Sequence, residues 1–274
     1  MSKVWFVTGS SRGLGRAVVE AALAGGDSVI ATARKPDQLK DLVAKHGDRV
    51  MPVALDVTDY AAALKAVRAG HEKLGRIDVV VNNAGYADLA AIEDISIENF
   101  RAQIETNFFG VVNVTKAVLP ILREQRRGHI FQISSLGGRI GTVGLAAYQS
   151  AKWAIGGFSI GLAQEVAPFG IKVTVLEPAG MRTDWAGSSM TIPTISEPYQ
   201  QTVGQFAAFL RGAQGKEPSD PRKVAELISS LVGREDAPLR LLVGPDAVEY
   251  ASKAAEALAE SDKKWRDVSV STAG

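Results

Sequence analysis

Short runs of apolar residues alternate with longer amphipathic stretches along most of the chain. The short runs are continuously apolar, which is typical of strands that are covered on both faces of a sheet. The longer stretches repeat their apolar residues at helical spacing. The predicted strands are Val4–Thr8, Ser28–Ala33, Val50–Ala54, Ile77–Val81, His129–Ile133, Ile171–Leu176 and Leu239–Val243.

Amphipathic stretches between these runs predict helices, chiefly at Gly13–Ala24, Asp59–Leu74, Ile97–Arg123 and Ala147–Pro168. Regular alternation of strand and helix favours a parallel sheet with right-handed crossovers. We therefore expect an α/β fold, with residues 1–274 forming a single doubly wound Rossmann-type domain. Its seven-stranded, mainly parallel sheet would carry helices on both faces. Folds of this kind bind ligands at the carboxyl ends of their strands.

The segment 185–220 interrupts this pattern with scattered proline and glycine among serine and threonine. It predicts a variable substrate-loop insertion with a short helix around Gln201–Leu210, since long insertions in compact domains tend to be lids or binding loops. The alternative is a mobile surface excursion. Beyond it we expect helices near Pro221–Leu231 and from Ala247 to about Lys264.

Composition narrows the function classes. The chain is 46% hydrophobic and 22% charged with a net charge of +1, so a nucleic-acid partner is not indicated. Without cysteine there are no disulfides, thiolate zinc sites or cysteine nucleophiles. The three histidines lie far apart, so no metal site is expected. We find no signal peptide and no apolar run near the ~20 residues of a membrane helix, and expect a cytoplasmic protein without a membrane partner.

A glycine-rich turn, Thr8–Gly15, lies between the first predicted strand and the first helix. Glycines let backbone N–H groups approach a pyrophosphate at a helix N-terminus, so the turn indicates dinucleotide binding. NAD sites usually place an acid at the end of the second strand, but Arg34 stands there. Its guanidinium suits a 2′-phosphate, which Arg12 would also reach, so NADP(H) is favoured over a possible NAD(H). The alternative for Arg34 and Lys35 is a solvated loop pair.

Two further strand ends carry polar residues. Asp56 follows the third strand, where a carboxylate would accept from an adenine amino group. The alternative is a helix cap, a role that Thr58 or Asp59 would fill equally well. Asn82–Gly85 follows the fourth strand and would either line a cofactor or build a turn.

Tyr148 and Lys152 lie four residues apart at the start of a predicted helix, so they share one face. A neighbouring ammonium favours the phenolate and lowers the pKa of the phenol, which suits proton exchange with a reacting oxygen. The same spacing also arises in incidental surface pairs, so the pair needs support from other residues.

Taken together, these motifs resemble the short-chain dehydrogenase/reductase family. The resemblance spans roughly Lys3 to Thr183, and two segments, Val29–Arg34 and Ala167–Val173, look like its hydroxysteroid-dehydrogenase-like branch. Ser135 precedes Tyr148 by thirteen residues, as in that family. The matching positions are the turn Thr8–Gly15, Asp56, Asn82–Gly85, Asn107, Ser135, Tyr148 and Lys152.

The resemblance implies hydride transfer between a nicotinamide and a carbonyl or secondary alcohol carbon. Tyr148 would be the general acid and base, and Lys152 would lower its pKa and hold the nicotinamide ribose. Ser135 would hydrogen-bond the substrate oxygen. Asn107 would anchor a water that relays protons towards Lys152.

The resemblance also implies a cofactor-binding set and one departure from it. Ala179 stands where the family usually has glycine, which would strain the backbone if a positive φ were needed. The implied cofactor-binding residues are Gly9, Ser11, Arg12, Gly13, Leu14, Gly15, Arg34, Asp56, Val57, Asn83, Ala84, Gly85, Tyr148, Lys152, Pro178, Gly180 and Thr183.

Apolar residues of the insertion, such as Trp185, Met190 and Phe209, suggest an apolar ketone or alcohol substrate, or serve only to pack the lid. By resemblance, the Asn107 helix, through Phe108, Phe109, Val111 and Val112, and the Phe158 helix would form a face for a homodimer or homotetramer. The rival functions are an NAD-dependent dehydrogenase, a non-catalytic cofactor sensor, and an epimerase or dehydratase. The complete catalytic set argues against the sensor, and the glycine spacing argues against the epimerase.

Overall fold

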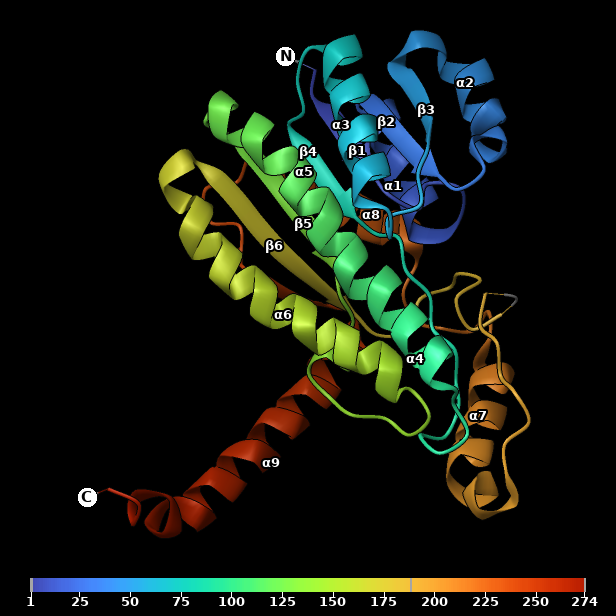
Figure 1. Cartoon of the computed structure of the whole chain (residues 1–274), viewed down its shortest axis with the longest axis vertical. Helices are drawn as coiled ribbons and strands as arrows, with labels where there is room; N and C mark the ends of the chain where they lie inside the picture. The colour runs from blue at the N-terminus through green and yellow to red at the C-terminus, as the bar shows by residue number, and fades with distance from the viewer. Residues whose placement is uncertain (1, 188, 274) are drawn as a thin grey trace.

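The computed structural model describes residues 2–187 and 189–273. Its strands form one parallel sheet in the order β3-β2-β1-β4-β5-β6-β7, so the doubly wound α/β fold is confirmed. Figure 1 shows the sheet between two layers of helices. The strands are β1 (Val4–Val7), β2 (Ser28–Ala33), β3 (Val50–Ala54), β4 (Val79–Asn82), β5 (Gly128–Ile133), β6 (Ile171–Pro178) and β7 (Arg240–Val243).

Alternate side chains of each inner strand enter separate cores on the two faces of the sheet. On β1, Trp5 and Val7 pack with α1 (Gly13–Ala24) and α8 (Pro221–Leu231). Phe6 packs on the opposite face. That face is covered by α3 (Tyr60–Leu74), α5 (Gly110–Gln125) and α6 (Ala146–Val166).

β4 begins at Val79, two residues later than the expected Ile77. The reason lies in Gln125 at the end of α5. Its side-chain amide donates to the Ile77 carbonyl at 2.6 Å and its oxygen accepts from the Ile77 N–H at 3.1 Å. These bonds replace a strand ladder at Ile77.

The expected helix Ile97–Arg123 contains a wide turn. It consists of α4 (Ile97–Ile104), a π-helical turn at Glu105–Phe109, and α5. π turns inside helices are rare and occur frequently at functional sites. Asn107 lies in the middle of this one and is fully buried.

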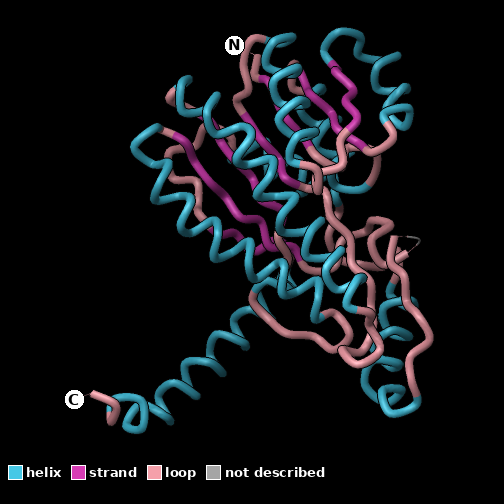
Figure 2. The backbone as a smooth tube through the Cα atoms, in the orientation of Figure 1, coloured by secondary structure: helices cyan, strands magenta, loops and turns pink. Residues whose placement is uncertain are grey.

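Insertion 185–220 lies over the carboxyl ends of the strands, with residue 188 outside the described residues. Its described residues form loops, a 3₁₀ turn (Glu197–Tyr199), a π turn (Gln200–Gly204) and α7 (Gln205–Ala213), and the loops are pink in Figure 2. Asp88, just after β4, accepts from Thr191 N at 2.9 Å. This bond holds the insertion against the chain that follows β4.

The last helix, α9 (Pro245–Val270), extends six residues beyond the expected end at Lys264. Ala247 and Ala251 in its first turns are buried against the body near β7. The rest of the helix projects away from the body, as the red helix in Figure 1 shows.

Candidate active site

The glycine turn brings α1 very close to the ends of β1 and β4. A Cβ on Gly15 would overlap the Gly9 carbonyl and the Asn83 side chain, so that position needs glycine. Gly9 has φ +67°, which favours glycine as well. No side chain caps α1 at Arg12, which leaves the first N–H groups of that helix free of a side-chain partner. A helix start of this kind suits a pyrophosphate.

The Asn82–Gly85 segment separates into a core residue and a turn residue. Asn82 is buried, and its amide donates to Thr115 Oγ1 at 3.1 Å and Gln132 Oε1 at 2.8 Å. Asn83 instead donates to the Thr8 carbonyl at 2.9 Å. Thr8 Oγ1 accepts from the N–H groups of Asn83 and Ala84 at 2.9 and 3.0 Å. This segment therefore braces the glycine turn.

Tyr148 and Lys152 meet in the first turns of α6. The Lys152 ammonium lies 5.4 Å from the centre of the Tyr148 ring. It donates to the Ile133 carbonyl at the end of β5, at 2.7 Å. The two residues are only 8% and 5% exposed, so the pair is not an incidental surface contact.

Burial dominates the acid–base properties of this pair. Loss of water raises the pKa of Tyr148 to about 12, although a hydrogen bond with Ser135 lowers it in part. The same loss of water lowers the pKa of Lys152 to about 7. We expected the ammonium to lower the pKa of the phenol, but in the free protein the phenol stays protonated because both charged forms are poorly solvated.

Ser135 joins the pair from the end of β5. Besides its bond with Tyr148, its hydroxyl accepts from Gly137 N at 3.0 Å and donates to the Pro178 carbonyl at 3.4 Å. These contacts place Ser135 at the short 3₁₀ turn Leu136–Gly138. The hydroxyl is thus oriented by neighbours on β6 as well as by its own turn.

Asn107 holds the chain that follows β4. Its amide donates to the carbonyls of Tyr86 and Gln103, both at 2.8 Å, and its oxygen accepts from Tyr86 N at 3.2 Å. A Cβ on Gly85 would lie 2.5 Å from that oxygen and 3.7 Å from Lys152 Nζ. Asn107, Gly85 and Lys152 therefore lie together beneath the site.

The two arginines expected at a 2′-phosphate have different surroundings. Arg34 is exposed at the end of β2 and close enough to influence Tyr86 electrostatically. Arg12 forms an ion pair with Asp184 at 3.1 Å. A 2′-phosphate would have to compete with that carboxylate for Arg12. The ion pair also joins the glycine turn to the residue that directly precedes the insertion.

Other expected cofactor residues have local roles as well. Asp56 Oδ1 accepts from the N–H and hydroxyl of Thr58 at 3.0 and 2.8 Å, while Asp59 is the residue that caps α3. Val57 is buried, and its carbonyl accepts from Asn113 at 2.9 Å. The Leu14 side chain belongs to the core, so only its backbone faces the turn.

The strand end after β6 lies beside the turn. A Cβ on Gly13 would be 3.6 Å from Thr183, so these two residues are neighbours, and Ser11 in the turn is half-buried. The Gly180 carbonyl accepts from Ser219 N at 3.3 Å. Among residues 2–187 and 189–273, Arg126 is the one non-glycine residue with a positive φ, so Ala179 causes no left-handed strain.

Apolar side chains of the insertion cover Tyr148. The Trp185 ring lies 5.4 Å from the Tyr148 ring. Met190 is buried in the same cluster, but Phe209 is 65% exposed and points away, so it is not a pocket residue. The other members are Ala87, Leu89, Ala91, Leu145, Val203 and Ala207, with Ile192, Ile195, Tyr199, Phe206 and Leu210 packed against them.

Sequence reasoning missed a buried carboxylate. Glu177 on β6 is fully buried between two arginines. Arg139, just after the turn that follows Ser135, donates through Nε to Glu177 Oε2 at 2.7 Å. Arg240 on β7 donates to Oε1 at 2.8 Å and to the Gly138 carbonyl at 3.4 Å. The sequence does show an acid within an otherwise apolar strand. It does not show that Arg139 and Arg240 pair with that acid.

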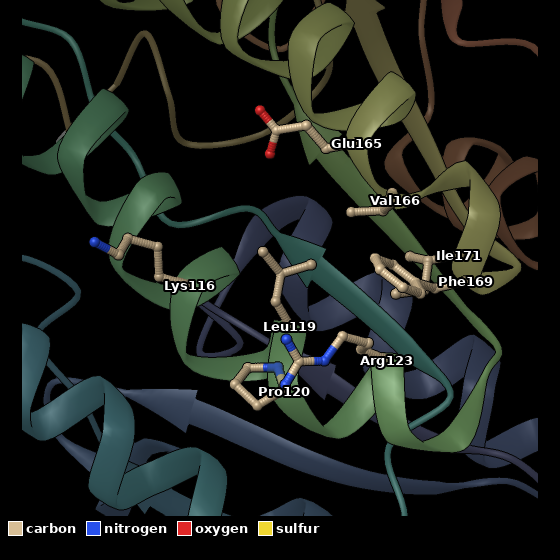
Figure 3. A pocket seen from close by; sticks show the side chains of 8 residues that line it. All are labelled: Lys116, Leu119, Pro120, Arg123, Glu165, Val166, Phe169 and Ile171. Atoms are coloured by element: carbon tan, nitrogen blue, oxygen red, sulfur yellow. The ribbon is translucent and has the colours of Figure 1, made fainter.

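A pocket of about 280 Å³ lies elsewhere, between the C-terminal parts of α5 and α6. Figure 3 shows Leu119 and Pro120 from α5 beside Phe169 and Ile171. Ile171 opens β6, so this pocket is at the amino end of the sheet and away from Tyr148.

No three His, Asp or Glu side chains of residues 2–187 and 189–273 gather as a metal-binding group. No helix in that part of the chain combines the length and apolar character needed to cross a bilayer.

Comparison with known proteins gives matches over the whole length. Residues 3–191 match the family model described as short chain dehydrogenase. The "Oxidoreductase BOA17" of Botryotinia fuckeliana is 68% identical over 274 residues, all of both chains. The 3-ketodihydrosphingosine reductase of Bacteroides thetaiotaomicron is 36% identical over 89% of this chain and 88% of its own.

Solved structures agree. A short-chain dehydrogenase from Streptomyces avermitilis has a TM-score of 0.94 and 38% identity, with all of both chains covered. Two others have TM-scores of 0.73 and 25% identity. A Brucella melitensis 3-ketoacyl-(acyl-carrier-protein) reductase holds NADH (88% of this chain, 96% of that one). A Thermococcus sibiricus alcohol dehydrogenase holds 5-hydroxy-NADP (89% and 96%).

Burial of the Lys152 ammonium predicts that removing this charge stabilises the folded protein at low pH. The pKa of Lys152 falls from 10.5 to about 7, so between these pH values the unfolded chain binds more protons and stability rises with pH. Below pH 7 the folded protein carries the full cost of the buried charge. Lys152→Met should therefore raise the free energy of unfolding by several kcal/mol at pH 6 and much less at pH 10.

Denaturant unfolding of the cofactor-free protein at the two pH values measures this difference. Lys216→Met, at an exposed lysine, is the control and should change stability little at either pH. Destabilisation by Lys152→Met at pH 6 would contradict the account of Lys152 as a buried, unpaired charge.

Proposed function

The chain belongs to the short-chain dehydrogenase/reductase family, and on that premise we propose that it is an NADP(H)-dependent oxidoreductase acting on a carbonyl or secondary alcohol. One observation carries the proposal: the Tyr148 phenol lies beside Ser135, and Lys152 lies one helical turn further along with its ammonium 5.4 Å from the Tyr148 ring, both side chains buried at the strand ends. A non-catalytic sensor would have no use for a buried, unpaired ammonium beside a phenol.

The residues present fit a nicotinamide dinucleotide. The uncapped start of α1 and the close glycine turn suit a pyrophosphate, and Lys152 has a free ammonium edge for ribose hydroxyls. Asp56 and Val57 would lie at the adenine, with Asn83–Gly85 along the ribose. Pro178, Gly180 and Thr183 would lie at the carboxamide end. The bound nicotinamide would supply or accept the hydride.

In the reductive direction, Tyr148 Oη would give its proton to the substrate oxygen as negative charge develops there. The raised pKa of Tyr148 suits this role, because the phenol is protonated at neutral pH. Ser135 Oγ would hydrogen-bond the same oxygen. Lys152 would return a proton to Tyr148 and would itself be reprotonated from solvent through a water that Asn107 anchors.

Tyr148→Phe tests the acid directly. Loss of general acid catalysis should lower turnover by about 10²–10⁴-fold, while NADPH affinity changes little because the ring remains. Steady-state kinetics and cofactor titration measure the two effects. Tyr60→Phe, at a half-exposed tyrosine on α3, is the matched control. Activity retained by Tyr148→Phe would remove it as the acid.

Cofactor preference rests on Arg34, which is exposed at the β2 end where an acid would otherwise select NAD(H). Charge-assisted bonds to a 2′-phosphate contribute about 1.5–3 kcal/mol. Arg34→Ala should therefore weaken NADPH binding by about 10- to 100-fold and NADH binding by less than about twofold. Lys40→Ala, at an exposed lysine paired with Asp37, is the control. Equal losses for both cofactors would favour the NAD(H) alternative.

We propose an apolar ketone or alcohol as substrate, because apolar side chains surround Tyr148 on the insertion side. In a series of methyl ketones, each buried methylene contributes up to about 0.8 kcal/mol, so kcat/KM should rise up to about fourfold per carbon until the pocket is full. Trp185→Ala should flatten this series, and Phe209→Ala should not. A series without dependence on chain length would contradict the assignment.

Assembly and location belong to the same proposal. Phe108 packs edge-on against Phe109 and Phe158 at 5.3 and 6.2 Å, and Phe109 is half-exposed, which supports a self-association face on α5 and α6. Val111 faces the core and is not part of that face. We propose a homodimer or homotetramer in the cytoplasm, a setting that suits a cysteine-free chain.

A further inference from the structure

Helix α9 is long and mostly unsupported by the rest of the molecule. Its 26 residues span about 39 Å. The body contacts its start through β7 and the turn Leu136–Gly138. From Ala255 onwards every residue of the helix is exposed. An isolated helix of this kind gains little stability without packing along one face.

One face of α9 carries a stripe, called here the α9 stripe, at alternating spacings of four and three residues. This spacing is the heptad pattern of helices that pair with other helices. The stripe starts at residues buried against the body and continues without a break into solvent. Its members are Ala247, Ala251, Ala254, Leu258, Ser261, Trp265 and Val268.

Exposed apolar side chains concentrate on this helix. Of fourteen large hydrophobic side chains exposed in the described residues, six lie on α9. Leu258, Trp265 and Val268 belong to the stripe and are 62%, 54% and 60% exposed. Along its middle the stripe is flanked by small residues, Ala255 and Ala257, which permit close approach of a second helix.

We propose that the α9 stripe pairs with α9 of a second copy of this chain. Heptad spacing selects a helix as the partner, and a stripe that matches itself forms a two-fold interface. An anionic membrane is disfavoured, because α9 carries six acidic and four basic side chains. This pairing is independent of the proposed reaction.

The two helices run in opposite directions. Ala247 and Ala251 face their own body, so a copy running the same way would place its body in occupied space. Opposite directions place the tip of each helix beside the point where the other helix leaves its body. That arrangement brings Arg266 of one copy toward Glu256 and Glu260 of the other.

The contact is small. The free part of α9 is about 24 Å long, so two such helices bury less than the ~1,600 Å² of a standard interface. We therefore expect association in the micromolar range, added to any pairing through α5 and α6. A chain with two separate two-fold faces builds a tetramer from dimers.

The absence of cysteine permits a clean cross-linking test. Ser261→Cys places one thiol in the stripe, and Ser252→Cys places one on the opposite face of the same helix. A short bismaleimide should link Ser261→Cys into dimers at micromolar protein and leave Ser252→Cys largely monomeric on a denaturing gel. Equal yields from the two variants would overturn the pairing.

Sedimentation over a concentration series gives a second measurement. Leu258→Glu should halve the mass of the largest assembly, for example from tetramer to dimer. Val270→Glu, which lies off the stripe on the same helix, should leave that mass unchanged. Both changes are at exposed positions, so circular dichroism should show unchanged helix content. Identical sedimentation of wild type and Leu258→Glu would refute the proposal. Flotation with anionic vesicles that Leu258→Glu abolishes would instead identify a lipid surface as the occupant.

Discussion

The burial of the Lys152 ammonium is the constraint on which the site depends. A buried ammonium needs local hydrogen-bond acceptors, and Lys152 donates one hydrogen bond to the Ile133 carbonyl, where β5 ends. The Ser134 hydroxyl donates to the Lys152 carbonyl at 3.2 Å, which holds α6 against the same strand end. With α6 fixed in this way, Tyr148 lies one turn earlier and meets Ser135. The arrangement of Tyr148, Ser135 and Lys152 follows from where this lysine can be buried.

Burial and charge pairing act in opposite directions on this pair. Pairing alone would lower the pKa of the phenol, whereas removal of water raises it and lowers that of the lysine. The insertion contributes to the loss of water by placing the Trp185 ring 5.4 Å from the Tyr148 ring, at a tilt of 56°. Its position depends in turn on Asp88 and on the pairing of Asp184 with Arg12. The glycine turn is therefore connected to the insertion through Asp184, which directly precedes it.

Much of the architecture followed from the pattern of residues. The seven strands and the main helices fell near their expected positions, because continuous apolar runs and helical spacing are local signals. Where the structure differs from the expected elements, side chains compete with the backbone pattern. Gln125 took the backbone bonds of Ile77, so β4 started late. Asn82 and Asn83 are adjacent and alike, yet one faces a core network and the other the turn, since successive residues at a strand end point to opposite sides.

By itself the sequence determined the family, the parallel sheet and the order of the catalytic motifs, because these depend on short spacings such as the four residues from Tyr148 to Lys152. Tertiary structure decided what surrounds them. The bond from Thr191 to Asp88 spans 103 residues, and that from Arg240 to Glu177 spans 63. No local pattern encodes such contacts, since they arise only when strand ends and loops pack at one edge of the sheet. The pKa values of the pair belong to this second group, because burial is a property of the packed chain.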